Sequence, residues 1–251
     1  LAGSLLGRAR HAELGERWLY DGTADPVFVT AWLELMRSRS SSVDGHTHGI
    51  ALAGFADWPP FDSVVDSKLM KGEQSNTSVV VPARPNQLII KFYRVLAAGE
   101  SPDVQVSAKL TAMGSADVPT TFGWVTGSWR NPLDDNGAWV TGDLRVLREF
   151  IPNSEDAWRP ASNAALENSD FTSEAEELGA VTGRIHQQLA QAFGSEPPSA
   201  AERSAFLESL ENRIRWAWKE ARSYVGEYDE PLEYLLRQSD IVSLHVPLCD
   251  E

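Results

Sequence analysis

A lysine inside an apolar run is the residue of this sequence whose surroundings point most directly to chemistry. Lys91 lies in residues 88–94, Leu-Ile-Ile-Lys-Phe-Tyr-Arg. A charged amine in such a strand is costly unless it meets an anion. In phosphoryl-transfer enzymes a strand lysine of this kind reaches the nucleotide phosphates, and a turn between two strands covers them. The alternative is an edge-strand lysine whose stem packs on the sheet while its amine reaches water.

The residues before Lys91 predict a hairpin that would position it. Residues 72–81 read as a polar turn followed by a strand rich in Val, and a Pro/Asn turn precedes the lysine run. Strands rich in Val and Ile between turn residues are typical of a β-hairpin. Lys91 is therefore expected on the second strand of a hairpin.

The residues after Lys91 predict a helix and two more strands. Ser101, Pro102 and Asp103 form a helix start, with a capping side chain, a proline at the first position and an acid in the first turn. Strand-like runs follow at residues 120–125 and 139–147, and an extended connector follows at residues 148–152. Hairpin, helix, two strands and connector is the order of a kinase amino-terminal lobe that ends at its hinge.

Three runs, QSNTSVVV, LIIKFYRVLAAGESPDVQV and VLREFIPNSEDAW, resemble one family in particular. They are similar to the amino-terminal half of the actinobacterial maltokinases, which are aminoglycoside-phosphotransferase-like sugar kinases with an amino-terminal cap. Members typically carry EQSNTS, a strand ending in K-[LF]-[FY]-R-R-L, a G-x-NPD-x-E helix start and a QE-[FY]-[VI] hinge. The resemblance spans roughly residues 13–195, and glucosamine kinases share the architecture.

The resemblance implies phosphorylation of maltose to maltose 1-phosphate with ATP and Mg²⁺. Glucosamine kinase on the same fold is one alternative, and a non-catalytic fragment that binds nucleotide or sugar is another. The implied partners are a small sugar, maltose or an amino sugar, and an enzyme that interconverts trehalose and maltose. The implied nucleotide site is formed by the phosphate turn Ser75, Asn76, Thr77 and Ser78, by Lys91 for the phosphates, and by the backbone of Glu149, Phe150 and Ile151 for adenine.

Gln105 stands where the family usually has the glutamate that pairs with the strand lysine. We expect the Gln105 side chain within reach of Lys91 with no other acid closer. Asp103 and Glu100 are the alternatives, although Asp103 at a helix start could be bound to backbone N–H groups instead.

The family's H-G-D-x-H-x-x-Q catalytic loop and later D-F-[ED] segment have no match in this sequence. We therefore assign no catalytic residue and no metal ligand, and expect an incomplete copy that is inactive as it stands.

The expected fold class is α+β with segregated elements. We predict a cap over residues 1–68, a kinase-like lobe with an antiparallel sheet over 69–152, and helices of an incomplete second lobe over 153–251. Helices are expected after Asp25-Pro26, from Ser173, from Ser199 and over residues 232–236, with a Ser/Gly/His-rich loop at residues 38–49.

Composition limits the classes of partner. A hydrophobic fraction of 42% and nine tryptophans in 251 residues are typical of a folded globular protein. The net charge of −14 argues against nucleic acid and anionic membranes as partners. One cysteine excludes an internal disulfide framework and favours a cytoplasmic location.

Overall fold

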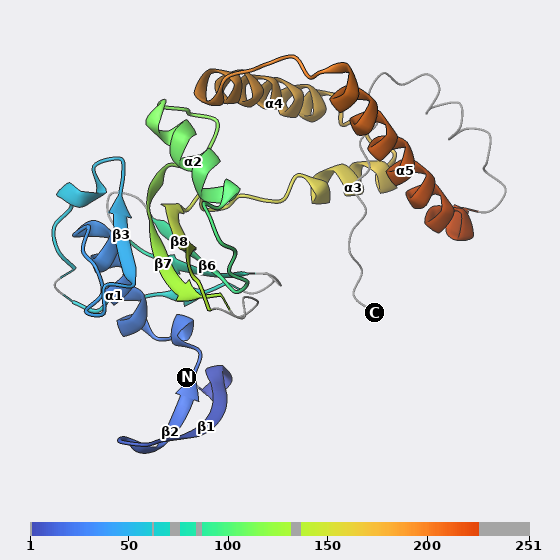
Figure 1. The fold of residues 1–251 in the computed structure, drawn as a ribbon. Helices are drawn as coiled ribbons and strands as arrows, with labels where there is room; N and C mark the ends of the chain where they lie inside the picture. Colours follow the sequence, from blue (N-terminus) through green and yellow to red (C-terminus); the bar gives the residue numbers. More distant parts are fainter. Residues whose placement is uncertain (1, 62, 71–75, 84–86, 132–136, 226–251) are drawn as a thin grey trace. The chain divides into compact units, whose positions relative to one another are not determined.

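A six-stranded antiparallel sheet is the main element of residues 1–194 in the computed structural model of this chain (Figure 1). The structure describes residues 2–61, 63–70, 76–83, 87–131 and 137–225. The strands lie in the order β3-β7-β8-β6-β5-β4, with bounds Thr47–Ala51 (β3), Lys68–Leu69 (β4), Asn76–Val81 (β5), Leu88–Tyr93 (β6), Thr121–Arg130 (β7) and Trp139–Glu149 (β8).

The predicted hairpin is confirmed as β5 and β6, and Lys91 lies on the second strand. Ser78 is the register partner of Lys91 on β5, and Val146 is its partner on β8. Side chains alternate between the two faces of a strand. Leu88 and Phe92 are buried in the core, so Lys91 lies on the opposite face of the sheet.

Helix α1, Pro26–Arg37, covers the core face of the sheet. Its predicted start is confirmed: the Asp25 carboxylate accepts a hydrogen bond from the N–H of Val27 at 2.9 Å, and Pro26 is the first helical residue. Val29, Leu33 and Met36 recur at helical spacing and are fully buried. They pack with buried residues of the sheet in one cluster, which includes Val79, Val81, Leu88, Ile90, Phe92, Phe122, Val125 and Leu147.

The division expected between residues 68 and 69 does not coincide with a break in the packing. Residues 47–51 pair with β7 as strand β3, in part of the segment for which we predicted a loop. Gly49 permits this because a Cβ there would lie 2.0 Å from the carbonyl oxygen of Leu35 on α1. Helix α1 packs in the same core as β5–β8, and β3 belongs to the same sheet. Because this packing crosses residues 68 and 69, the structure is not divided there.

A two-stranded hairpin, β1 (Leu5–His11) and β2 (Gly15–Tyr20), forms a separate sheet with little burial. Three short 3₁₀ helices lie at Ala2–Ser4 (η1), Gly22–Ala24 (η2) and Phe55–Asp57 (η3). The Asp21 carboxylate accepts hydrogen bonds from the N–H and the hydroxyl of Thr23, and these bonds fix the start of η2.

Helix α2, Pro102–Ala112, starts where the sequence predicts, but the Ser101 side chain does not cap it. Asp143 of β8, which is buried, accepts a hydrogen bond from the N–H of Ser101 at 2.6 Å instead. The segment before α2 lies close to β8, since a Cβ at Gly142 would be 2.2 Å from the carbonyl oxygen of Ala97. Strand β8 therefore holds the start of α2 against the face of the sheet that carries Lys91.

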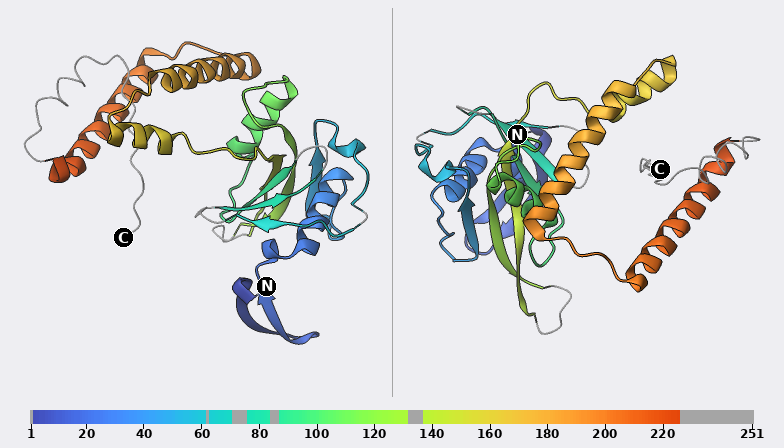
Figure 2. Two further views of the ribbon diagram at one scale, coloured as in Figure 1. Left: turned by 180° about the vertical axis from the view of Figure 1, so that it is seen from behind. Right: turned by 90° about the horizontal axis from the view of Figure 1, so that it is seen from above.

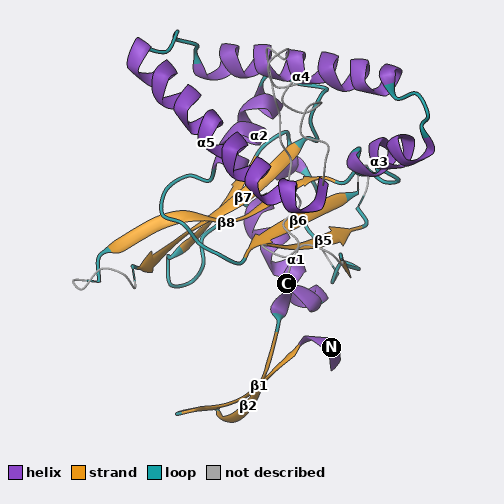
Figure 3. Ribbon diagram, turned by 90° about the vertical axis from the view of Figure 1, so that its right-hand side faces the viewer, coloured by secondary structure: helices purple, strands orange, loops and turns teal. Residues whose placement is uncertain are grey.

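Three α-helices follow β8 among the described residues (Figures 2 and 3). Helix α3, Trp158–Glu167, was not predicted, whereas α4, Thr172–Phe193, and α5, Ala200–Val225, start within one residue of the predicted positions. The second unit, which begins at Ser195, contains α5. The short helix expected at residues 232–236 lies outside the described residues. In the part of the chain that the structure describes, no helix is both long enough and apolar enough to span a membrane.

Candidate functional site

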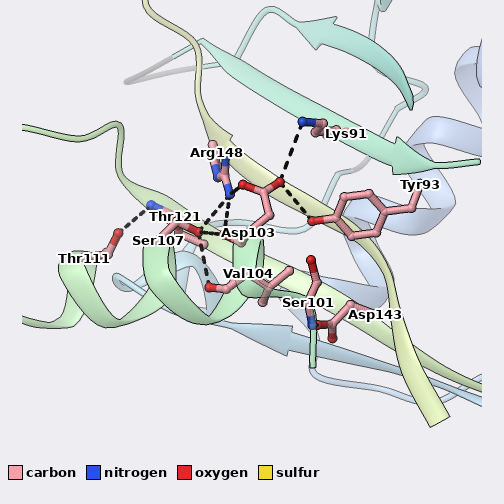
Figure 4. A network of polar contacts seen from close by, with 10 residues as sticks. All are labelled: Lys91, Tyr93, Ser101, Asp103, Val104, Ser107, Thr111, Thr121, Asp143 and Arg148. Carbon is pink, nitrogen blue, oxygen red and sulfur yellow. Dashed lines mark hydrogen bonds and ion pairs between the residues drawn. The ribbon is translucent and has the colours of Figure 1, made fainter. Parts of the chain in front are cut away.

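Lys91 of β6 faces the first turn of α2 and forms an ion pair with Asp103 (Figure 4). The distance from Lys91 Nζ to Asp103 Oδ2 is 3.7 Å. About 30% of the lysine side chain and 37% of the aspartate side chain are exposed, so the pair is open to solvent on one side. A strand lysine held by a helix acid in this way presents a positioned cation to an anionic ligand.

Arg148 of β8 binds the same carboxylate more closely. Its Nη2 donates to Asp103 Oδ1 at 2.6 Å, to the Asp103 carbonyl oxygen at 2.7 Å and to Ser107 Oγ at 2.9 Å. Arg148 is the register partner of Ile89, which alternates with buried Leu88 and Ile90, so it shares a face with Lys91. Helix α2 is therefore fastened to two neighbouring strands through one aspartate.

Tyr93 completes the surroundings of Asp103. Its hydroxyl donates to Asp103 Oδ2 at 3.2 Å, and burial together with the nearby carboxylate raises the pKa of Tyr93 to about 12. Partial burial alone would raise the pKa of Asp103, but hydrogen bonds and charge from Arg148, then Lys91 and Tyr93, lower it overall. Asp103 is therefore an anion at neutral pH.

Gln105 does not have the expected position as the partner of Lys91. Its side chain is exposed, and its Nε2 donates to Glu100 Oε2 at 3.2 Å. Asp103, one of the two alternatives, is the acid that Lys91 contacts. Residues two positions apart lie about 200° apart around a helix, so Asp103 and Gln105 cannot both face β6. The assignment of Gln105 to the position of the family's lysine-pairing glutamate is therefore wrong.

The expected phosphate turn is only partly described. Ser75 lies outside the described residues, and Asn76, Thr77 and Ser78 belong to β5. Ser78 is opposite Lys91 and therefore on its face. The Thr77 hydroxyl accepts from Arg94 Nε at 2.6 Å on the face of the sheet opposite Lys91, so it is this hydroxyl that is directed away from Lys91. Asn76 pairs with Tyr93, again on the Lys91 face.

Two of the three N–H groups in the expected adenine segment are used inside the sheet. The Glu149 N–H donates to the Thr120 carbonyl and the Phe150 N–H donates to the Gln87 carbonyl, both at 2.8 Å. The Ile151 N–H has no hydrogen-bond partner among the described residues, and its carbonyl accepts from the Ser154 hydroxyl at 3.0 Å. Of these three N–H groups, that of Ile151 is therefore the one left for the expected adenine contact.

Sequence reasoning missed Arg148 and Tyr93, which together hold Asp103. A signal for Arg148 existed, because the family pattern has Gln at the position before the hinge glutamate and this chain has Arg. No group of three His, Cys, Asp or Glu side chains that could hold a metal ion is found among the described residues.

No known protein-family model matches this sequence. Chemically, the site offers a cation at Lys91 and an ionised carboxylate at Asp103 that positions it.

Proposed function

We propose that the first compact unit, Leu1–Gly194, is the nucleotide-binding part of an ATP-dependent sugar kinase, with maltose as the substrate. The observation that carries this proposal is the Lys91–Asp103 pair, which joins a strand lysine to an acid in the first turn of the following helix. Kinases use a strand lysine paired with a helix acid to bind the α- and β-phosphates of ATP. In this proposal residues 69–152 act as the kinase-like amino-terminal lobe.

The register of the sheet supports a position for each part of the nucleotide. Lys91 and Ser78 are opposite one another in mid-sheet, whereas Leu88 pairs with Glu149 at the end near Ile151. Three residues of a strand span about 10 Å, which leaves room for a nucleoside between adenine and phosphate contacts. Lys91 would neutralise the α- and β-phosphates, and the Ile151 N–H would donate to adenine.

Mg²⁺ supplies charge neutralisation to the phosphates when it is bound in kinases. The described residues do not fit such a site, because none of their acidic side chains form a cluster of potential ligands. We therefore assign the metal and the catalytic base to no residue of the described chain. A glucosamine kinase and a non-catalytic nucleotide-binding module share the same Lys91 site and differ in what happens after binding.

Binding of a fluorescent ATP analogue to the 251-residue chain tests the proposal, with unlabelled ATP as competitor. Lys91→Met removes the phosphate cation and should weaken binding at least tenfold. The matched control is Lys109→Met, which changes an exposed lysine in the last turn of α2 and should leave affinity unchanged. Equal affinity of the two variants would show that Lys91 does not bind the nucleotide phosphates.

A coupled assay for ADP release then separates the three alternatives. ADP should be released with maltose under the first proposal and with glucosamine under the second. Nucleotide binding without release on either sugar would identify a non-catalytic module.

A further inference from the structure

A cavity on the α1 face of the sheet contains a buried arginine that nucleotide binding does not use. Arg145 of β8 is 8% exposed and lines a cavity of about 410 Å³, to which η2, α1 and β6 also contribute. Phe92, which lines the same cavity, alternates with Lys91 along β6. Arg145 and Phe92 therefore lie on the face of the sheet opposite Lys91, and Tyr93, whose hydroxyl contacts Asp103, also lines the cavity.

Two aromatic rings hold the guanidinium of Arg145. Its Cζ lies 3.3 Å from the ring centroid of Trp32 on α1 and 5.0 Å from that of Phe92. Attraction between a cation and the ring faces stabilises this arrangement. Stacking covers the flat faces of a guanidinium and leaves its N–H groups, which lie in the plane, to find acceptors.

The charge of Arg145 is not balanced by any described residue. Its Nε and Nη1 are buried without a hydrogen-bond partner, and no carboxylate in the described ranges lies within ion-pair distance of it. Burial lowers the pKa of Arg145, but a guanidinium stays protonated near neutral pH. An unpaired buried charge is costly, so the cavity favours an anion.

Asp21 is the carboxylate that lines the same cavity, and it is already bound elsewhere. It accepts from Arg94 Nη2 at 2.6 Å and from the N–H and hydroxyl of Thr23 at 3.0 and 2.8 Å. These contacts leave the Asp21–Arg94 pair internally neutral. The net charge presented to a ligand in the cavity is therefore that of Arg145.

The rest of the wall is largely apolar. Leu6, Phe28, Phe92 and Leu144 all line the cavity. Its volume lies within the range of about 300–1,000 Å³ that small-molecule sites occupy. A ligand that fits both the charge and the wall has one anionic group and an apolar body.

We propose that this cavity binds a small organic anion, a carboxylate or a phosphate monoester on an apolar body, with Arg145 as its counter-ion. Arginine is suited to both groups because its planar donors match their oxygens. The chain carries a net charge of −14, which disfavours non-specific attraction of anions. Saturable binding of an anion would therefore report a specific local cation.

Calorimetric titration of the 251-residue chain with benzoate, phenyl phosphate and neutral benzyl alcohol, at constant ionic strength, tests the proposal. At least one anion should bind saturably and the alcohol should not, and the tighter anion identifies the group that the site prefers. Arg145→Met should weaken that binding at least tenfold. The control is Arg130→Met, the same change at an exposed arginine over the Trp139 ring, and it should have no effect.

Failure of both anions to bind, binding of the alcohol as tightly as the anions, or undiminished binding by folded Arg145→Met would overturn the proposal and leave Arg145 as a structural cation. A melting curve establishes whether that variant folds. If it does not fold, the NMR resonances of the whole Arg145 guanidinium in the wild-type chain decide. A shift of any of them on saturation supports the site, and unshifted resonances reject it. Lys91→Met should leave anion binding intact, so this proposal stands apart from the nucleotide site.

Discussion

Arg148 and Asp103 meet across the boundary between β8 and α2, with 2.6 Å from the guanidinium Nη2 to the carboxylate Oδ1. This contact is shorter than the 3.7 Å ion pair that Lys91 makes with the same aspartate. Arg148 therefore sets the position of the Asp103 carboxylate, and that carboxylate in turn positions the Lys91 amine.

Asp103→Asn should weaken binding of the ATP analogue several-fold, because the amide keeps the shape of the side chain but loses the charge that holds Lys91. The matched control is Gln105→Ala, two residues further along α2, which should leave affinity unchanged since its side chain is exposed. Fluorescence titration measures both. A loss of affinity in the Gln105 variant alone would show that the pairing is assigned to the wrong residue.

The pH dependence of stability should differ in sign between Asp103 and Asp143. The pKa of Asp103 is lowered, so its carboxylate contributes stability that is present above its usual value near 3.8 and is lost as the pH falls further. Burial is the main cause that raises the pKa of Asp143, so its ionisation reduces stability as the pH rises above that value.

Denaturant unfolding from pH 2.5 to pH 7 checks this prediction. Relative to the wild type, Asp103→Asn should become progressively less stable as the pH rises from about 3, and Asp143→Asn should become progressively more stable above about pH 4. Parallel curves for the two variants would contradict it. Asp143→Asn could also lower the free energy of unfolding by a constant amount, because it alters the hydrogen bond from the Ser101 N–H. The comparison still holds, because it uses only the slope of the free energy of unfolding against pH.

Gly49→Ala should destabilise the protein by about 3 kcal/mol or more, because the added methyl group would overlap the carbonyl of Leu35, which cannot move without shifting α1. The control is Gly183→Ala on α4, where nothing lies within 4 Å of the new Cβ. Alanine is the better helix former by about 1 kcal/mol, so the control should be neutral or slightly stabilising. Denaturant midpoints measure both, and a small effect at Gly49 would mean that β3 does not pack on α1 as described.

The contact between α4 and the segment after α2 rests on Asp117, whose carboxylate accepts from Arg184 at 2.7 Å and from Gln188 at 3.2 Å. Arg184→Gln should therefore speed hydrogen exchange of α4 amides while β6 and β8 stay protected. The control is Arg203→Gln on α5. Unchanged exchange in α4 would show that the ion pair does not fasten this helix.

Helices α4 and α5 should drive association of the chain at high concentration. Leu178 and Phe193 of α4 are close to half exposed, and Phe206, Leu207 and Trp216 of α5 are more than half exposed. Light scattering should show a mass that rises with concentration, and Phe206→Ser with Leu207→Ser should reduce the rise. A constant monomer mass in the wild type would contradict this.

Local patterns predicted the elements around Lys91 well and their long-range partners poorly. The hairpin and the start of α2 follow from turn residues, β-branched runs and Pro102, which act within a few residues. The choice between Asp103 and Gln105 depends on which way α2 is rotated over β6, and no local pattern determines that rotation. Strand β3 was missed because its pairing with β7 joins distant residues.

Arg145 could have been found by the reasoning applied to Lys91. It stands in the run Leu144-Arg145-Val146-Leu147, a charge in an apolar strand that is costly without an anion. The sequence could not show that Trp32 and Phe92 would enclose it, because those residues come from two other elements.

The pairing of β3 with β7 has a consequence for synthesis of the chain on the ribosome. Ala51 and Gly123 are register partners, 72 positions apart by their numbers. At a translation rate of about 5–20 residues per second, β7 is synthesised roughly 4–14 s after β3. For that time β3 and the apolar side of α1 lack the strand against which they pack. During that interval the side chains of Leu33 and Met36, which are fully buried in the folded protein, remain incompletely covered. During synthesis, the apolar side chains of the amino-terminal third are thus the ones that a chaperone would bind.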